Sequence, residues 1–479
     1  MRNACRMAAF HPIFCEKLML VLMITAVLLI CVIYMNHRSA SIASHEARSV
    51  SRMLPITPVD FSQYQKRLDD VIAAVPSFKA NVDCGGVVGS NDTAVQAAEQ
   101  WTFDENLFME GFYKYTDRCE AISKTFLFLD SPLSLEEYEY PLAYGLLVHS
   151  DAVQVMLLLG SVYQPQNQYC IAVSSSADEQ FQTQMFELME CFPNIFVTLT
   201  QPVKWCEYSV LQGVLECVHY LTKLKADWKY YQYLSGVDLP LKTNLEMVRI
   251  FKKLNGSFNA GIHDLEGERY RQGKEAPLPL WKSSLSATFS RESAEFLISN
   301  SKIRELRDYL KGTMCPDETF WATVAGNPDH IPMPGGFNAS LWKEKLTGEW
   351  DKLYATNNTV LLTAKAGYDL FQPEKYYISR YQIWHGDACA GTFTGFSCAY
   401  GVKDLAALVK RPELVAHKLY FSVQPATYFC LYETVRRRAF LGNTDFNVDA
   451  YAELPGPKLL AGTPFEELLF NAPQGFKFY

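Results

Sequence analysis

The chain has 479 residues, of which 49% are hydrophobic and 14% aromatic, and its formal net charge is −8 at pH 7. A chain of this length and composition can bury a large core, so we expect one or two globular domains and no extensive disorder. The acidic balance argues against a nucleic-acid-binding surface that covers much of the protein, because such surfaces are basic. The expected partners are therefore neutral, or are recognised by a local cluster of charges.

The first predicted element is an apolar segment close to the N-terminus. Residues 18–35 carry no charged side chain, and their number approaches the roughly 20 that a membrane-spanning helix needs. A cleaved signal peptide is the alternative, since residues 41–43 offer small side chains for cleavage, but its apolar core is usually only about 7–15 residues long. The sequence thus predicts a cytosolic tail over 1–17 and a transmembrane signal-anchor over 18–35.

The orientation of this segment follows from the residues after it, because basic residues flank it on both sides and favour neither orientation. Ten of the thirteen cysteines follow the segment, and so do four N-x-[ST] sequons, at Asn91, Asn255, Asn338 and Asn357. A disulfide framework and N-glycosylation both belong to the secretory pathway. We therefore expect a single-pass type II protein whose residues after about 36 are luminal.

The next segment, residues 36–80, contains several prolines among polar residues and predicts a stem of low order with one helix over 60–74. Beyond residue 120 two kinds of apolar pattern alternate. Strand patterns lie in 139–150, 168–175 and 194–200, and helical patterns lie in 151–163 and 178–192. This alternation predicts βαβ units and a mostly parallel central sheet. Ligands of such folds bind outside the carboxyl ends of the strands.

Several stretches of the chain resemble one enzyme family, the core-2/I-branching β-1,6-N-acetylglucosaminyltransferases (glycosyltransferase family 14). They are YPLAYGLLVHS at 140–150, residues 162–173, residues 228–256 and CPDETFWAT at 315–323. The block SGVDLPLKTN at 235–244 is the most specific of them, and the resemblance runs from about 84 to 440. It implies a luminal catalytic domain over 81–479 with a GT-A-like α/β fold, in a type II Golgi membrane protein. It also implies inverting transfer of a sugar from a UDP donor to a hydroxyl, with no metal or other cofactor.

The resemblance implies four disulfides as well, because the cysteine spacings match those of the family. They are Cys84–Cys430, Cys119–Cys191, Cys170–Cys217 and Cys389–Cys398. Cys206 and Cys315 are left over, and we expect them to be buried free thiols.

Asp317 and Glu318 are adjacent carboxylates at the predicted start of a helix. Acids in a first helical turn gain about 0.3–1 kcal/mol each, so one interpretation is helix-start chemistry. The resemblance implies a second role for Glu318, that of the catalytic base. An acceptor hydroxyl is a poor nucleophile until a carboxylate within about 3 Å removes its proton. We expect Glu318 to be the base and Asp317 to be a helix-start or orienting residue.

The departing UDP needs positive charge, which many GT-A enzymes supply with a metal bound by a D-x-D motif. The chain has no D-x-D, and the resemblance implies fixed cations instead. Lys418 matches the family lysine, whereas Gly395 stands at the position of the family arginine. Substitutes for this arginine are Lys403, Lys410 and Arg411, although each fits a solvated surface charge better.

Donor and acceptor contacts follow from the same resemblance. Ser174, after the second predicted strand, stands at the position of a donor-binding aspartate. Arg269 matches an arginine that contacts the acceptor, and Tyr381 and Trp384 lie in a segment whose aromatic rings do so in the family, although core packing is an equal alternative for both rings. Two positions stay open between ligand contact and a local structural role, namely Ser209 and Asp238.

The leading functional hypothesis is a Golgi enzyme that transfers N-acetylglucosamine, or another hexose such as glucose, in β-1,6 linkage to O-glycans of glycoproteins. One alternative is a catalytically weakened relative that binds glycans or a partner protein, suggested by the changes at Gly395 and Ser174. The other is a xylosyltransferase-like enzyme, because such enzymes share the fold.

Overall fold

The structure is a computed structural model that describes residues 60–355, 376–441 and 447–470, with no side-chain description for 349–355. The chain divides into two compact units, Met1–Met53 and Leu54–Tyr479, and all described residues belong to the second. The predicted tail over 1–17, the predicted anchor over 18–35 and the sequon at Asn357 therefore lie outside the described residues. No helix within the described residues combines the length and the apolar character needed to cross a membrane.

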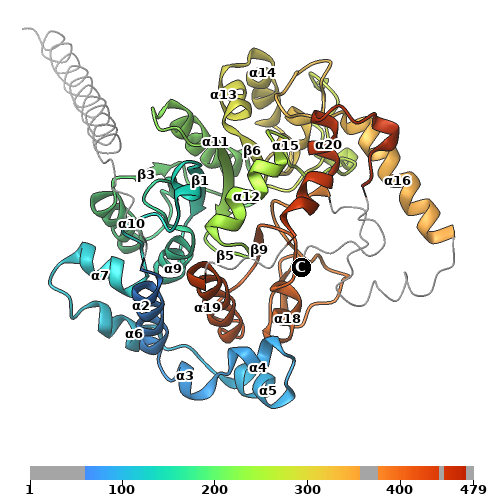
Figure 1. The fold of residues 1–479 in the computed structure, drawn as a ribbon. Coiled ribbons are helices and arrows are strands. Elements are labelled where there is room, and N and C mark those ends of the chain that lie inside the picture. Colours follow the sequence, from blue (N-terminus) through green and yellow to red (C-terminus); the bar gives the residue numbers. More distant parts are fainter. Residues whose placement is uncertain (1–59, 356–375, 442–446, 471–479) are drawn as a thin grey trace, which may run out of the picture. The chain divides into compact units, whose positions relative to one another are not determined.

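A five-stranded sheet with the order β3-β2-β1-β4-β6 forms the centre of the domain (Figure 1). The first four strands in this order are parallel, and β6 is antiparallel to β4. The strands are β1 (Leu142–Val148), β2 (Gln168–Ser174), β3 (Ile195–Thr200), β4 (Tyr230–Ser235) and β6 (Thr288–Ser290). The predicted mixed α/β fold with a mostly parallel central sheet is thus present. Nearly every residue of β1, β2 and β4 is buried, as expected for parallel strands with both faces covered.

Helices connect and cover these strands. They are α9 (Ala152–Val162), α10 (Glu179–Cys191), α11 (Tyr208–Lys223), α12 (Asn244–Leu254), α13 (Arg291–Ser299), α14 (Ser301–Leu310), α15 (Asp317–Ala325) and α16 (Ala339–Ala355). Among them α11 packs on β1 and β2, and α10 packs on β3. The helical patterns predicted over 151–163 and 178–192 correspond to α9 and α10, so both predictions are confirmed.

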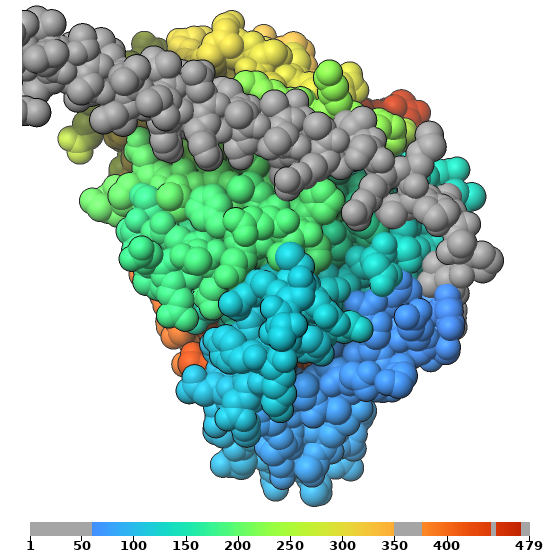
Figure 2. All heavy atoms as spheres, turned by 90° about the vertical axis from the view of Figure 1, so that its left-hand side faces the viewer, coloured from blue at the N-terminus to red at the C-terminus, as the bar shows by residue number. Residues whose placement is uncertain are grey.

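The segment before the sheet is helical, with α2 (Phe61–Ala74), α3 (Phe78–Asn81), α4 (Cys84–Val88), α5 (Asp92–Gln100), α6 (Glu105–Phe112), α7 (Arg118–Thr125) and α8 (Leu135–Tyr138). In Figure 2 this segment, coloured blue to cyan, covers one side of the domain next to the green residues that follow it. The predicted helix over 60–74 is confirmed as α2. Leu68 and Ile72 of this helix are fully buried, so the packed domain begins before residue 81.

The last part of the chain returns to the sheet through short elements. They are β7 (Thr392–Thr394), β8 (Ser397–Ala399), α18 (Leu405–Leu408), β9 (Val415–His417), α19 (Ala426–Leu441) and α20 (Pro455–Leu460), with 3-10 turns η4 (Val402–Asp404), η5 (Val448–Glu453) and η6 (Phe465–Glu467). An earlier 3-10 turn, η1, spans Gly267–Arg269. Strand β9 pairs antiparallel with β5 (Asp238–Pro240), which follows β4 directly. This pairing brings the C-terminal part of the chain to the carboxyl end of β4.

The described residues contain the four expected disulfides. Cys84–Cys430, with a sequence separation of 346, joins α4 to α19. The expectation of free thiols at Cys206 and Cys315 is wrong, because these residues form a fifth disulfide. Both have left-handed backbone, and the Cys315 N–H donates to the Cys206 carbonyl oxygen at 3.0 Å. The family resemblance supplied only the other four pairs, and spacing alone does not determine which cysteines pair.

Candidate active site

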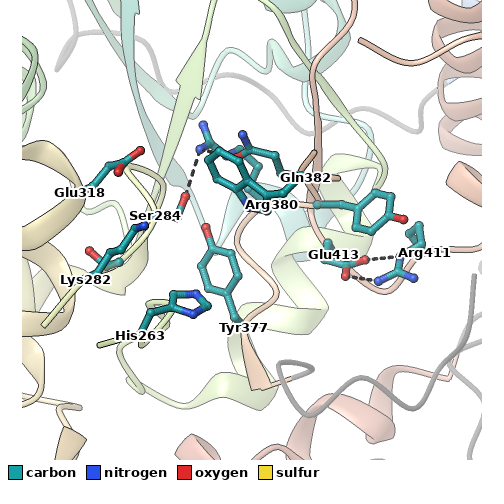
Figure 3. Close-up of a pocket in the computed structure, with 13 residues that line it drawn as sticks. His263, Lys282, Ser284, Glu318, Tyr377, Arg380, Gln382, Arg411 and Glu413 are labelled. Atoms are coloured by element: carbon teal, nitrogen blue, oxygen red, sulfur yellow. Dashed lines mark hydrogen bonds and ion pairs between the residues drawn. The ribbon is translucent and has the colours of Figure 1, made fainter. Parts of the chain in front are cut away.

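A cavity of ≈ 290 Å³ lies beside Glu318. Its wall combines five segments of the chain, which are residues 261–263, residues 282–284, the start of α15, residues 377–384 and residues 411–413. Figure 3 shows Glu318 and Lys282 at one side of this cavity and the Arg411–Glu413 pair at the other, with Arg380 between them.

Glu318 is the second residue of α15, and its position is fixed by the backbone on both sides. Its N–H donates to the Cys315 carbonyl oxygen at 3.0 Å, and its own carbonyl oxygen accepts the Ser283 N–H at 2.6 Å. The side chain keeps 26% of its surface exposed. A carboxylate that is fixed by its backbone and open to a cavity can accept a proton from a bound hydroxyl.

Arg269 holds the Glu318 carboxylate through an ion pair of 2.8 Å between Nη1 and Oε2. Its Nε pairs with Glu266 at 2.8 Å, and Lys282 pairs with the other oxygen of Glu266 at 2.7 Å. The four side chains form a row of alternating charge that ends at Glu318. The structure therefore brings two predicted site residues, Arg269 and Glu318, into direct contact.

Asp317 differs from its neighbour because its carboxyl is buried, with 8% of the residue exposed. Burial, and next the charge of Glu318, raise the pKa of Asp317 from 3.8 to about 7. Its Oδ1 atom has no hydrogen-bond partner among the described residues. Asp317 does begin α15, as expected, but desolvation outweighs the favourable effect of the helix terminus on its charge.

Lys418 and Gly395 lie close together, as the resemblance implies. The Lys418 Nζ donates to the carbonyl oxygen of Thr394 at 2.6 Å, in the turn that joins β7 to β8. Gly395 follows in the same turn with a φ of 61°, a conformation that glycine adopts without the steric cost of a side chain. The Lys418 ammonium thus lies next to the turn in which glycine replaces the family arginine.

Ser174 ends β2 and is buried. Its hydroxyl oxygen accepts the Val203 N–H at 3.0 Å and lies 2.7 Å from the Ser176 hydroxyl. The side chain therefore organises the loop after β3, and its predicted contact with the donor stays a prediction. Ser209 also has a local role, because its hydroxyl accepts the Lys204 N–H at 3.0 Å.

Asp238 is fully buried at the start of β5, and both of its oxygens are engaged. Oδ2 accepts the Ser235 N–H at 2.7 Å, and Oδ1 lies 2.6 Å from Nδ1 of His417. Burial, and next the charge of Arg380, lower the pKa of His417 to about 4. The ring is therefore neutral near pH 7 and donates its Nδ1–H to Asp238. These bonds favour the local structural role of Asp238 over ligand contact.

The two aromatic candidates differ in their exposure. The Arg411 guanidinium lies 4.0 Å from the ring centroid of Tyr381, and the Tyr400 ring packs parallel to it at 5.9 Å. Trp384 is 47% exposed at the edge of the cavity. Of the two rings, Trp384 has the more accessible surface for stacking on a sugar.

None of the three candidate substitutes for the family arginine is shown as an unpaired cation beside Lys418. Arg411 is not the expected surface charge, because it is buried and pairs with the buried Glu413. A buried guanidinium needs such a partner to offset its desolvation. Lys403 and Lys410 are exposed, as expected, and Lys403 pairs with Glu99 at 2.9 Å.

Sequence reasoning missed Arg380, a buried residue on the cavity wall. Its Nη2 donates to the Ser284 hydroxyl and to Oε1 of Gln382, at 3.0 Å each. A single arginine within a strand-like stretch carries no pattern, although its position next to Tyr381, in a segment already singled out, was an available signal.

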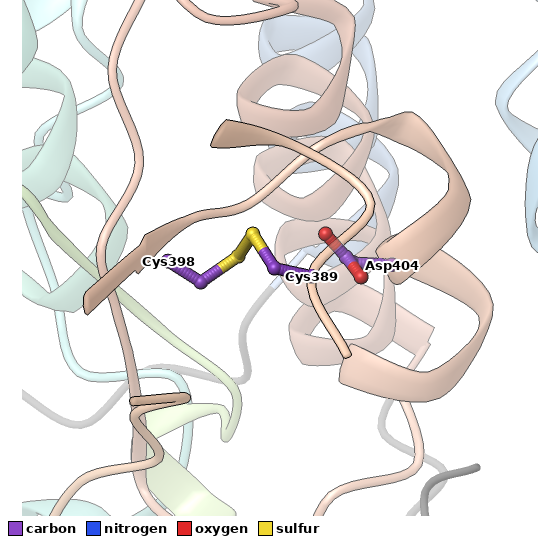
Figure 4. A group of neighbouring side chains, drawn as sticks. All are labelled: Cys389, Cys398 and Asp404. Carbon is purple, nitrogen blue, oxygen red and sulfur yellow. A yellow bond between two sulfur atoms is a disulfide. The ribbon is translucent and has the colours of Figure 1, made fainter. Parts of the chain in front are cut away.

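One cluster of side chains within the described ranges has the composition of a metal site, namely Cys389, Cys398 and Asp404. Figure 4 shows that the two sulfur atoms are joined in a disulfide. Asp404 accepts the N–H groups of Gly401 at 2.8 Å and Ala390 at 3.2 Å. These three residues close the loop around β7 and β8 and offer no set of free ligands.

The chain matches one family model and several curated proteins. The model of the Core-2/I-branching enzyme family matches residues 142–372. The rat protein named β-1,3-galactosyl-O-glycosyl-glycoprotein β-1,6-N-acetylglucosaminyltransferase 3 is 28% identical over 80% of this chain and 88% of its own length. A human β-1,3-galactosyl-O-glycosyl-glycoprotein β-1,6-N-acetylglucosaminyltransferase is 29% identical over 71% of this chain and 78% of its own.

Among solved structures, the mannosyltransferase Ktr4p from S. cerevisiae matches with 10% identity and a TM-score of 0.18, over 54% of this chain and 70% of its own. That likeness is too weak to carry an argument. The family match and the curated relatives show instead that the chain is similar to the Core-2/I-branching enzymes, which are glycosyltransferases.

Proposed function

We propose that the protein transfers N-acetylglucosamine, or another hexose such as glucose, from a UDP-sugar to an O-glycan of a glycoprotein in β-1,6 linkage. The observation that carries this proposal is the Glu318 carboxylate, which is fixed by its backbone, paired with Arg269 and open to the cavity. The relatives' names support the linkage and the class of acceptor.

The proposed reaction is a single displacement. The acceptor oxygen forms a bond to the anomeric carbon while its proton passes to Glu318, so the nucleophile gains charge only as it attacks. The bond between the anomeric carbon and the phosphate oxygen breaks, and its electron pair leaves with UDP. Attack opposite the leaving group inverts the configuration at the anomeric carbon.

Lys418 supplies positive charge to the departing diphosphate in this proposal. Preorganised cations stabilise such charge without help from a metal, so the proposed reaction is metal-independent. We expect EDTA to leave transfer largely intact, and Lys418→Ala to lower turnover by about 10²–10³-fold. A strict requirement for Mn²⁺ would contradict this part of the proposal.

The proposed place of action is the Golgi membrane, with the described domain in the lumen. The four disulfides found as expected, together with the fifth, support an oxidising compartment.

The decisive test replaces the base. Glu318→Gln keeps the shape of the side chain but cannot accept a proton, so transfer by the full-length protein should fall by roughly 10²–10⁴-fold. Binding of UDP should stay within about two-fold of the wild type, because the residue acts on the acceptor. A fully active Glu318→Gln variant would contradict the mechanism.

A second candidate function is binding of glycans or a partner protein by a weakened relative, which Gly395 and Ser174 favour because they replace polar family residues. A panel of UDP-N-acetylglucosamine, UDP-glucose and UDP-xylose separates the candidates. Transfer from UDP-xylose alone would support a xylosyltransferase-like enzyme, and no transfer or hydrolysis with any donor would support the binding protein.

A further inference from the structure

Arg380 is a buried cation without a buried counter-charge. Only 8% of the residue is exposed, and its two hydrogen-bond acceptors, Ser284 and Gln382, are neutral. Its Nε atom is buried and has no hydrogen-bond partner among the described residues. Within the described ranges no carboxylate forms an ion pair with it. A buried charge of this kind is unfavourable unless an opposite charge joins it.

The other cations of the same cavity wall are already neutralised. Lys282 pairs with Glu266 at 2.7 Å, and Arg411 pairs with Glu413. The pairing of these two residues leaves Arg380 as the cation of the described wall that can receive an anion from a ligand (Figure 3).

Neither of two buried carboxyls, Asp238 and Asp317, neutralises Arg380. Asp238 is engaged with His417 at 2.6 Å. Asp317 has a pKa of about 7, so it is only partly charged near neutral pH, and it forms no ion pair with the guanidinium. Arg380 therefore keeps its charge available to the cavity.

A second cation, Lys418, lies on the segment that pairs with the segment of Arg380. Tyr381, the neighbour of Arg380, donates its N–H to the Val415 carbonyl oxygen at 2.7 Å and accepts the His417 N–H at 2.9 Å, and Lys418 follows directly on this pairing. Burial, and next the charge of Arg380, lower the pKa of Lys418, and among the described partners its Nζ hydrogen-bonds to the Thr394 carbonyl oxygen. Two neighbouring cations, neither of them paired with a described carboxylate, match a ligand group with more than one negative charge. A diphosphate meets this requirement, whereas a single carboxylate would neutralise one cation only.

We propose that Arg380 binds the diphosphate of the UDP-sugar together with Lys418, and so supplies the second cation that Gly395 lacks. This inference rests on the proposed function. When the bond between the anomeric carbon and the phosphate oxygen breaks, its electron pair adds one negative charge to the diphosphate, and Arg380 stabilises that charge from the wall that also carries Glu318. The cation thus comes from a different segment of the chain, 15 residues before Gly395.

The test compares UDP with uridine as ligands of the full-length protein in calorimetry. Arg380→Gln should weaken UDP binding at least about ten-fold and leave uridine binding unchanged, because only UDP carries the phosphates. Arg380→Lys, which keeps the charge but loses the planar fork, should fall between the wild type and Arg380→Gln. Lys403→Gln is the matched control, because it removes an exposed cation that is paired with Glu99, and it should bind UDP as the wild type does.

Turnover gives a second measurement. Arg380→Gln should lower kcat by about 10²–10³-fold with little change in the KM for the acceptor. Equal binding of UDP by Arg380→Gln and the wild type would overturn the inference while leaving the proposed function intact. A higher KM for the acceptor with unchanged UDP binding would overturn it in favour of an acidic sugar in the acceptor.

Failure of the wild type to bind UDP or to transfer any sugar would overturn the proposed function and the inference with it. If Arg380→Gln does not fold, the decision comes from Arg380→Lys, Lys418→Ala and their combination. The two substitutions should be non-additive for UDP binding, because both residues contact the same group. Additive effects would overturn the inference.

Discussion

Asp317 and Glu318 are the first two residues of α15, and their carboxyls have different surroundings. The Glu318 side chain faces the cavity with 26% of its surface exposed, whereas the residue Asp317 retains 8%. A helix N-terminus favours each negative charge by about 0.3–1 kcal/mol. Burial opposes the charge of Asp317 more strongly and brings its pKa to about 7. The same helix start therefore holds one carboxylate that is accessible and one carboxyl that titrates near neutral pH.

Asp317→Asn should change how stability depends on pH. The folded-state pKa of about 7 lies above the ordinary value of 3.8, so the folded protein binds more protons and the wild type loses stability as pH rises through 7. At about 1.4 kcal/mol per pKa unit, the loss between pH 5 and pH 8 is on the order of 3 kcal/mol. Asn does not titrate, so the variant should become more stable relative to the wild type at pH 8 than at pH 5. Denaturant unfolding at both values measures this difference, and a pH-independent difference would contradict the raised pKa.

Trp384 and Tyr381 should respond differently to truncation. Trp384 is 47% exposed at the cavity. A stacking contact is worth about 0.5–1.5 kcal/mol, so we expect Trp384→Ala to raise the KM for the acceptor by roughly two- to ten-fold, with little change in thermal midpoint. Tyr381 packs against Arg411 and Tyr400. Tyr381→Ala should therefore cost about 3–5 kcal/mol of stability. The opposite pattern in midpoint and KM would assign the stacking role to Tyr381.

Among single residues of the candidate site, the sequence could predict those that stand in a motif or at a family position. Glu318 and Arg269 were found in this way, and the structure places them in contact. Arg380 could not be, because its importance depends on what surrounds it: neutral partners, burial and a nearby lysine. None of these is visible in a linear sequence.

At the scale of elements, periodicity predicted the long strands and helices but not the short ones. β1, β2 and β3 alternate with α9 and α10 at lengths that period-2 and period-3.6 patterns identify. β5 and β9 have three residues each and pair across the chain, with Asp238 opposite His417. Elements this short leave no periodic signal, and their position depends on tertiary contacts alone.

The block SGVDLPLKTN makes hydrogen bonds to several neighbouring elements. Asp238 bonds to His417, and the buried Lys242 donates to the Arg411 carbonyl oxygen at 2.6 Å. Thr243 and Glu246 form a capping box at the start of α12. The block therefore joins β4, β9 and α12, and it positions the segment that carries Lys418. Its specificity reflects these contacts, which sequence reasoning could not separate from ligand binding.

The Cys206–Cys315 disulfide links the loop before α11 to the turn before α15. The Glu318 N–H bonds to the Cys315 carbonyl oxygen, so the bridge should help to hold the base in place. We expect the double substitution of Cys206 and Cys315 by serine to cost about 2–4 kcal/mol of stability and to lower the turnover of the folded protein.

The matched control for this prediction is the double substitution of Cys119 and Cys191 by serine. The disulfide between these two residues joins α7 to α10, and neither residue lines the cavity. It should lower stability by a similar amount while turnover per folded molecule stays the same. Equal turnover in both variants would show that the Cys206–Cys315 bridge acts on stability alone.

At the scale of the whole molecule, the first helices and the last long helix form one packed unit with the sheet. Cys84–Cys430 joins α4 to α19, and α2 packs on α19, where the rings of Tyr64 and Phe440 stack at 5.7 Å. The resemblance predicted this disulfide, but composition placed residues up to 80 in a stem. Short amphipathic helices such as α2 contain too few apolar residues to distinguish a packed element from a linker before the partner surface is known.

If the domain is luminal, its exposed sequons should carry N-glycans. Asn91 and Asn255 are both exposed, so we expect each to carry an N-glycan, and peptide:N-glycosidase should lower the apparent mass of the full-length protein. Asn91 caps α5 by accepting the Ala94 N–H at 3.0 Å, and Asn255 ends α12 with a φ of 47°. Asn91→Asp keeps the capping oxygen, and Asn255→Gly suits the left-handed backbone. Each substitution should therefore remove one glycan without unfolding the domain.

The contradicting outcome is that, in protein made by cells with a secretory pathway, both asparagines are unmodified and the five disulfides are reduced. The domain would then not face the lumen, and the orientation proposed for residues 18–35 would be wrong.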